Sequence, residues 1–318
     1  MRTTILLLAV LTLSTCTNGH EIKVRVIDEN RRPLPGAEVA IIFMRPVNGT
    51  SRVFRGVSGT DGRYGARETI TIGALVTVKK PGYYNSEMRN EFGARDYNVD
   101  LVMRRRISPI PLVVRDLELA IPKDAGRIGV DLEAGDWVAP FGKGTVSDFE
   151  VRFSNSFSGY QYSGEEWDRI RFAKVNANLS EEALRDVYGK WDAAATITAS
   201  GGLGFVFEEP DFNPFSELTM PHEAPEEGYG PKFEMEGSTY DSSRMEIEKR
   251  PLFLRTRAEV RDGKVVRANY VKLPEGIQLD ARGSLRFTYY FNPRANDRNL
   301  EFDPRQNLAK EQERSYPP

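Results

Sequence analysis

Three acidic residues in a glycine-rich stretch are the first candidates for chemistry in this sequence. Asp131, Glu133 and Asp136 lie close to Trp137. Two carboxyl groups held about 5 to 10 Å apart are enough for glycoside hydrolysis, and a tryptophan can form one wall of a sugar site. The same residues also fit turns around a core tryptophan. The stretch therefore allows a carboxylate-dependent glycan-active site, although the structural interpretation is favoured.

The tryptophans are the second set of candidates. Trp137, Trp167 and Trp191 could form a platform on which sugar rings stack. Large aromatic side chains in a β-rich domain usually belong to the core, where they bury much apolar area. The three residues are therefore candidate ligand contacts whose alternative role is packing.

Oxygen-bearing side chains gather near the end of the chain. Asp297, Asn299, Glu301 and Asp303 follow one another at every second position. Carboxylate and amide oxygens suit calcium, but this spacing is not that of an EF-hand loop. Neighbouring arginines could pair with the same acids. These four residues are weak calcium candidates, and the sequence predicts no obligatory cofactor.

Histidine is scarce, which argues against several hydrolase classes. His20 and His222 are the only two, and neither is followed by glutamate three positions later, as a zinc peptidase would need. The Gly-x-Ser-x-Gly pattern of a serine nucleophile is also missing. The sequence gives no support for a histidine-dependent hydrolase, and we expect the protein not to be an enzyme, with the carboxylate site as the remaining alternative.

The beginning of the chain predicts export. Residues 1–19 have a basic start and an apolar run that is too short to span a bilayer, so we expect a signal peptide cut after Gly19. The alternative is lipidation of Cys16, because Leu13 to Cys16 resembles a bacterial lipobox. Cys16 is the only cysteine, so an intramolecular disulfide is impossible. The expected location is secreted or periplasmic, with a lipid anchor at the cell surface as the alternative, and no transmembrane segment in the mature chain.

Composition and periodicity predict an all-β protein of two domains. The chain has 318 residues, 40% of them hydrophobic, and a net charge of −2, which indicates neither disorder nor a nucleic-acid-binding field. Ile22, Val24 and Val26 alternate with polar residues, the pattern of a strand with one buried face. Hairpins are predicted around Gly201-Gly202 and Asp262-Gly263. A short helix is predicted over 180–188, and long loops elsewhere in the second half.

Motifs in the first part carry a family resemblance. They are Val24-x-Val26-x-Asp28, Pro33-Leu34-Pro35-Gly36-Ala37-x-Val39, Gly59-Thr60-Asp61-Gly62-x-Tyr64 and Val76-x-Val78-Lys79-Lys80-Pro81-Gly82-Tyr83. With these motifs the segment resembles the carboxypeptidase regulatory-like family, which implies a transthyretin-like β-sandwich that serves as an accessory domain without a catalytic site.

The second half carries phrases such as Asp131-Leu132-Glu133-Ala134-Gly135-Asp136-Trp137-Val138-Ala139-Pro140 and Phe287-Thr288-Tyr289-Tyr290-Phe291-Asn292-Pro293. With them it resembles a group of uncharacterised exported bacterial proteins, which implies the same two-part plan and extends the fold prediction only.

These observations combine into one interpretation of the chain. We expect a sandwich domain over 21–105, a linker over 106–112, a second β-sandwich domain over 113–305 and a polar tail over 306–318. The expected function is that of an exported, non-catalytic binding or structural protein that engages polysaccharide or a cell-envelope protein. The alternative is a carboxylate-dependent glycan-active enzyme with its site in the second domain.

Overall fold

The computed structural model shows an all-β protein that divides into two compact units, residues 1–105 and 106–318. No α-helix occurs in the described part of the chain, and no helix there is long and apolar enough to cross a membrane. The short helix predicted over 180–188 lies outside the described residues. The structure describes residues 20–44, 50–69, 71–90, 96–158, 190–200, 204–208, 216–238 and 250–309.

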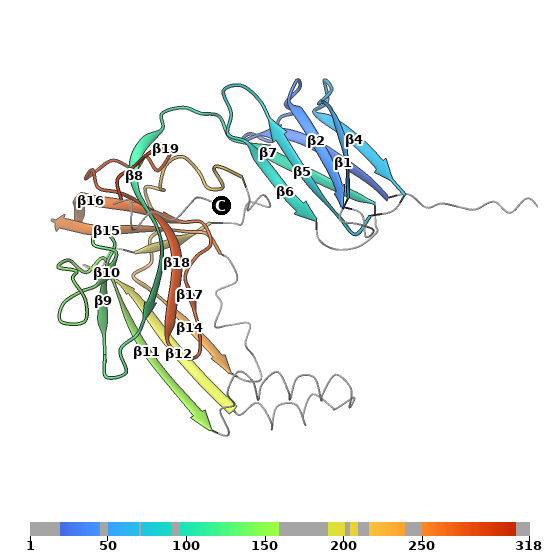
Figure 1. The fold of residues 1–318 in the computed structure, drawn as a ribbon. Helices are drawn as coiled ribbons and strands as arrows, with labels where there is room; N and C mark the ends of the chain where they lie inside the picture. The colour runs from blue at the N-terminus through green and yellow to red at the C-terminus, as the bar shows by residue number, and fades with distance from the viewer. Residues whose placement is uncertain are drawn as a thin grey trace, which may run out of the picture. The chain divides into compact units, whose positions relative to one another are not determined.

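Unit 1 is a β-sandwich of two sheets (Figure 1). All neighbouring strands are antiparallel except β1 and β7, which are parallel. One sheet has the order β4 (Arg63–Glu68), β1 (His20–Asp28) and β7 (Tyr97–Met103). The other has the order β3 (Ser51–Val57), β2 (Glu38–Met44), β5 (Gly73–Lys79) and β6 (Ser86–Asn90).

The alternation read from the sequence explains how the two sheets of unit 1 pack. On β1, Ile22, Val24 and Val26 are buried in the core of the sandwich, while the residues between them face outward. Side chains that alternate along a strand point to opposite faces of the sheet. Leu101 and Met103 on β7 join the same core. The prediction of a β-sandwich in this part of the chain is confirmed.

Unit 2 is a larger sandwich built from a five-stranded and a seven-stranded sheet (Figure 1). The five-stranded sheet has the order β10 (Asp136–Trp137), β9 (Ile128–Asp131), β11 (Phe149–Ser158), β12 (Lys190–Ala199) and β14 (Lys232–Ser238). The other has the order β13 (Phe205–Phe207), β15 (Leu252–Arg261), β16 (Lys264–Leu273), β18 (Ser284–Asn292), β8 (Ile110–Ala120) and β19 (Phe302–Asn307), with β17 (Gln278–Leu279) also paired to β18.

The two sheets of unit 2 differ in how they are covered. The seven-stranded sheet is buried on both faces. One face packs on the five-stranded sheet, where Phe287 of the first sheet and Phe149 of the second belong to one core. The other face carries a second hydrophobic cluster that includes Phe253 and Leu300. Strands buried on both faces are expected to be almost continuously apolar, as in Leu252 to Leu254. The five-stranded sheet instead keeps one face exposed, with outward residues such as Ala194.

The structure of unit 2 differs from some of the sequence predictions and agrees with another. The hairpin around Gly201-Gly202 is wrong, because β12 and β13 belong to different sheets and β13 pairs with β15. The hairpin at Asp262-Gly263 is confirmed, with both turn residues at positive φ. Strand β8 begins inside the predicted linker 106–112. Strand β19 ends inside the predicted tail 306–318, because this segment pairs with β8.

Candidate functional site

Asp131, the first acid of the glycine-rich stretch, is a buried structural anchor. It is 3% exposed, and its carboxylate accepts hydrogen bonds from the backbone N–H groups of Glu133, Ala134, Thr145 and Val146. Burial alone would raise the pKa of Asp131, but these backbone hydrogen bonds and the charge of Arg257 outweigh it and lower the pKa. The group is thus an ionised acceptor with its lone pairs in use, which is a poor arrangement for a general acid.

Arg257 connects this loop to the opposite sheet. Its guanidinium on β15 contacts Asp131 at 2.9 Å, Asp148 at 2.8 Å and the more exposed Glu133. Asp148 is fully buried and also accepts hydrogen bonds from the Leu132 N–H and the Thr256 hydroxyl. We call Asp131, Glu133, Asp148 and Arg257 the Arg257 network. It links the two sheets of unit 2 through charge-assisted hydrogen bonds, which are stronger than neutral ones.

The third predicted acid holds a turn. Asp136 accepts hydrogen bonds from the backbone N–H groups of Trp137 at 2.8 Å and Lys143 at 3.0 Å. The three acids of the sequence prediction therefore lie in one loop system, but they face backbone donors and Arg257. This arrangement favours a structural role for the three acids over a catalytic pair. One detail differs from the expected exposed turn: Asp131 is buried.

The predicted tryptophan platform is not assembled in the described residues. Trp137 is 4% exposed, and its indole N–H donates to the carbonyl of Ala120. Trp191 packs against the same core from β12. Both side chains contact the interior, which argues against their role as sugar contacts. Trp167 lies outside the described residues.

The calcium candidates also have structural partners. Asp297 and Asn299 accept backbone hydrogen bonds two residues further on, as is common in turns. The buried Glu301 accepts the N–H groups of Ile107 and Ser108 at 2.8 and 2.7 Å, which fixes the segment predicted as a linker.

Asp303, the last calcium candidate, pairs with an arginine. Hydrogen bonds from Arg305 lower its pKa to about 2. In the part of the chain that the structure describes, no three His, Cys, Asp or Glu side chains are grouped so that they could hold a metal ion.

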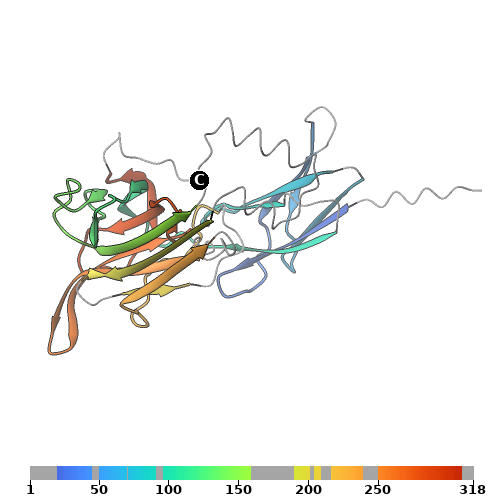
Figure 2. The same ribbon diagram turned by 90° about the horizontal axis from the view of Figure 1, so that it is seen from below.

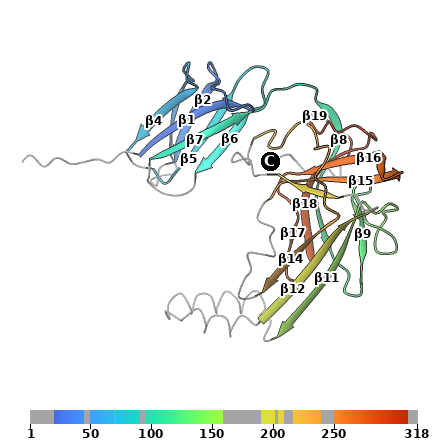
Figure 3. The same ribbon diagram turned by 180° about the vertical axis from the view of Figure 1, so that it is seen from behind.

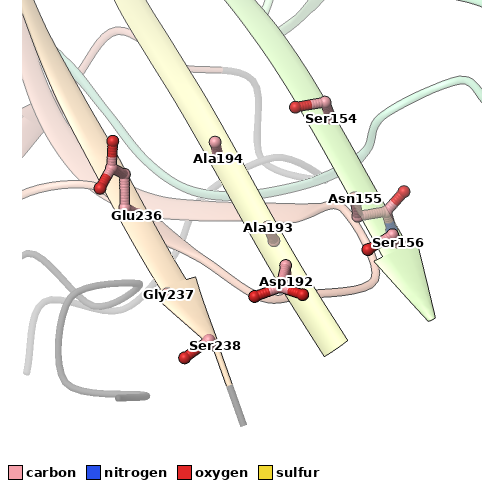
Figure 4. Close-up of a pocket in the computed structure, with 9 residues that line it drawn as sticks. All are labelled: Ser154, Asn155, Ser156, Asp192, Ala193, Ala194, Glu236, Gly237 and Ser238. Carbon is pink, nitrogen blue, oxygen red and sulfur yellow. The ribbon is translucent and has the colours of Figure 1, made fainter. Parts of the chain in front are cut away.

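The outer face of the five-stranded sheet offers a different candidate site. Strands β11, β12 and β14 lie side by side, as Figure 2 and Figure 3 also show. A groove of about 480 Å³ crosses these three strands. Its lining residues, drawn in Figure 4, are Ser154, Asn155, Ser156, Asp192, Ala193, Ala194, Glu236, Gly237 and Ser238.

Strand register places the polar groups of this groove in two rows. Ser154, Ala194 and Glu236 form one row, and Ser156, Asp192 and Ser238 form the next. Directly opposite side chains in an antiparallel sheet have Cβ atoms about 5 Å apart, and diagonal neighbours are about 7 to 8 Å apart. Asp192 and Glu236 are diagonal neighbours, so their carboxylates flank the small side chain of Ala194 (Figure 4). We call this site the Asp192 groove.

Groups of this kind can hold a polyhydroxyl ligand. Serine hydroxyls both donate and accept, while carboxylates accept strongly from hydroxyl donors. The residues stand on a sheet whose other face is packed in the core, with Ala193 and Met235 buried on neighbouring strands. Such a surface is already ordered before binding, which reduces the entropy cost of capture.

Sequence reasoning missed the Asp192 groove. The signal in each strand is weak: Ser154 and Ser156 alternate with other residues on β11, as Glu234 and Glu236 do on β14. The site appears only when three strands are paired in the correct register. That pairing spans a long stretch of chain and cannot be obtained from alternation.

Comparisons with known proteins give no family. No family model matches the chain, and no curated protein matches it, so the resemblance to the carboxypeptidase regulatory-like family is not confirmed. Solved structures with a likeness include a hydroxyquinol 1,2-dioxygenase from Pseudomonas putida, with 12% identity, a TM-score of 0.24 and coverage of 28% of this chain and 57% of that one. The chain thus spans little more than half of the dioxygenase.

Two further structures show a similar degree of likeness. The C-terminal domain of a shaft pilin from Lactobacillus rhamnosus has 13% identity and a TM-score of 0.22, over 28% of this chain and 98% of that one. A protein from Bacteroides uniformis, provisionally described as carbohydrate-binding, has 9% identity and a TM-score of 0.18, over 87% and 98% of the two chains. TM-scores this low support no conclusion about function.

Proposed function

We propose that this chain is an exported, non-catalytic binding protein that holds carbohydrate in the Asp192 groove. The observation that carries the proposal is the groove itself: hydroxyl and carboxylate side chains converge on a hollow of about 480 Å³ on an exposed sheet face. Ligand sites of a few hundred Å³ with a few placed polar groups are common in proteins. The expected export signal in residues 1–19 and the resemblance of residues 21–105 to an accessory domain fit this proposal.

The charge of the groove narrows the class of carbohydrate. Asp192 and Glu236 are acidic, and none of the described residues that line the groove is a lysine or an arginine. An anionic sugar would be repelled, whereas neutral or amine-bearing sugars would find acceptors for their hydroxyl and ammonium groups. We therefore expect neutral or amino sugars to bind.

The test is a glycan array probed with the chain from His20 to Pro318, with and without calcium, followed by titration of the best neutral glycan. Asp192→Asn and Glu236→Gln should each weaken binding, because they remove charged acceptors worth about 1.5 to 3 kcal/mol. Ala194→Gln should block the groove without changing charge. Glu227→Gln is the matched control, because Glu227 is an exposed acid outside the groove.

Three outcomes would count against this function. Binding that survives Ala194→Gln would place the ligand elsewhere, as would equal losses in the Glu227→Gln control. An array on which no neutral or amino sugar is bound would reject carbohydrate as the ligand of the Asp192 groove. In that case a protein of the cell envelope is the remaining partner class.

The alternative function is a carboxylate-dependent glycan-active enzyme. Its acids would be Asp192 and Glu236, because diagonal neighbours on paired strands stand about 7 to 8 Å apart at the backbone, close enough for two side-chain carboxyl groups to act on one bond. Product analysis on any polysaccharide that binds separates the two functions. New reducing ends that disappear in both Asp192→Asn and Glu236→Gln would establish the enzyme.

A further inference from the structure

A second hollow lies on unit 1, on the outer face of the three-stranded sheet β4-β1-β7. It has a volume of about 1050 Å³. Its polar residues alternate with core residues on each strand: β1 and β4 contribute most of them, and β7 adds Asn98 and Asp100. Those on β1 and β4 are Glu21, Lys23, Arg25, Arg63 and Arg67, and Gly65 lies between the two arginines of β4.

A glycine on the edge strand β4 leaves open space beside the central strand β1. Gly65 pairs with Lys23 on β1, and Lys23 pairs with Asn98 on β7. Gly65 is exposed and has no side chain to fill the space above the sheet. A Cβ there would lie 3.7 Å from the Lys23 Cγ and 3.3 Å from the Ile22 carbonyl oxygen, so a side chain fits with a small adjustment.

Positive charge dominates the rim. The lining holds four cations against two carboxylates. Glu21 is shared between Lys23 at 3.1 Å and Arg67 at 3.6 Å, and Arg25 is paired with Asp100. The guanidinium of Arg63 lies 3.8 Å from the carboxylate of Asp61, which is outside the hollow. Lys23, Arg63 and Arg67 keep 61 to 69% of their side chains exposed, so their charge is accessible to a ligand.

We propose that this hollow binds an acidic polysaccharide through the carboxylates of its sugar units. Charge complementarity is the argument, since a polymer with regularly spaced carboxylates can meet several cations at once. Outward residues two apart on a strand are about 7 Å apart, so the cations form a spaced series. The guanidinium of arginine also matches the geometry of a carboxylate. Glu21 and Asp100 hold part of this series in place, and Gly65 leaves room for the sugar ring.

This site is independent of the Asp192 groove. It lies on the other unit, has the opposite charge and takes the opposite class of sugar. Asp192→Asn should therefore leave binding to the hollow unchanged. Failure of one proposal does not affect the other.

The experiment measures binding of the chain from His20 to Pro318 to immobilised polygalacturonate in the presence of a calcium chelator, at low and high salt. Lys23→Gln combined with Arg63→Gln should weaken binding on the order of tenfold or more, because two charge-assisted contacts are lost. Gly65→Gln should weaken it by filling the hollow at unchanged charge. Arg55→Gln is the matched control, since Arg55 is an exposed arginine on β3 of the other sheet.

Two ligand controls complete the design. Fully methyl-esterified polygalacturonate keeps the sugar backbone but loses the charge, so it should bind much more weakly. Polyglutamate keeps the charge without the sugar and should also bind weakly. Equal binding of either control would overturn the proposal, as would an equal loss in Arg55→Gln or the absence of binding to polygalacturonate. Added salt should weaken the interaction, as expected for exposed ion pairs.

Discussion

Arg257 is the residue that balances the buried charge of unit 2. It lies at positive φ, next to an irregularity in the β15–β16 register, and its guanidinium faces one fully buried and one nearly buried carboxylate. The central carbon of this guanidinium also lies 5.0 Å from the centre of the Phe291 ring. A buried carboxylate that loses its partner is costly, since its charge is then neither hydrated nor paired.

We therefore predict that Arg257→Ala lowers the free energy of unfolding of unit 2 by about 3 to 5 kcal/mol. Arg267→Ala is the matched control: this arginine, on β16, has an exposed ion pair with Glu259, and its loss should cost less than about 1 kcal/mol. Urea unfolding followed by tryptophan fluorescence measures the effect, because all three tryptophans belong to unit 2. Similar costs for the two variants would show that the Arg257 network does not stabilise the fold.

Asp131 gives unit 2 a pH dependence. Its pKa is lowered in the folded state, so the unfolded chain binds a proton more readily than the folded one. Its contribution to stability is therefore complete above the unfolded pKa of about 3.9 and is lost as the pH falls through the lower folded pKa.

The prediction is a comparison of the protein with Asp131→Asn across pH. The variant should be less stable at pH 7, and the difference in the free energy of unfolding should shrink as the pH falls from 5 to about 2.5. Asp116→Asn, an exposed acid paired with Arg286, is the control and should show little change. A difference that stays constant with pH would mean that the ionised carboxylate is not what stabilises the loop.

At the scale of elements, sequence reasoning succeeded where contacts are local. The Asp262-Gly263 hairpin was found because both turn residues take positive φ, which this dipeptide favours. The hairpin predicted at Gly201-Gly202 is wrong because β12 and β13 belong to different sheets, and β13 pairs with β15. Local turn chemistry does not say which strands will pair.

Two glycines provide a test of turn chemistry in unit 1. Gly62 has a φ of 77°, and a Cβ there would lie 2.4 Å from the carbonyl oxygen of Val26. Gly82 has nearly the same φ, 81°, but a Cβ there meets nothing within 4 Å. Gly82→Ala should cost about 1 to 2 kcal/mol from backbone conformation alone.

Gly62→Ala should cost distinctly more than Gly82→Ala, because the clash with the Val26 carbonyl is added to the same backbone term. Thermal unfolding followed by far-ultraviolet circular dichroism compares the two variants. Equal losses would indicate that the turn after Gly59 relaxes and that the close approach to Val26 does not restrict it.

At the scale of the whole molecule, the sequence predicted the fold class but not the candidate site. Alternation along single strands was enough to predict sandwiches, because it records which face of each strand is buried. The acids and Trp137 drew attention because they stand together in sequence, yet their partners are backbone groups and an arginine more than 100 positions away. The Asp192 groove and the hollow on unit 1, by contrast, are lined by residues on separate strands, and no sequence motif marks them.

The separate cores of the two units lead to the last prediction. Among the described residues, one hydrophobic cluster lies within unit 1 and two others lie within unit 2. Each unit can therefore lose its packing without removing the apolar contacts of the other, and their unfolding should separate. Two transitions are then expected in circular dichroism, since both units are β-sandwiches, and only the one from unit 2 coincides with the tryptophan transition. Gly62→Ala should shift the transition that tryptophan fluorescence does not report, while Arg257→Ala should shift only the one that it does report. If either substitution moved both transitions together, the two units would be one cooperative body, and substitutions in one hollow could then alter binding at the other.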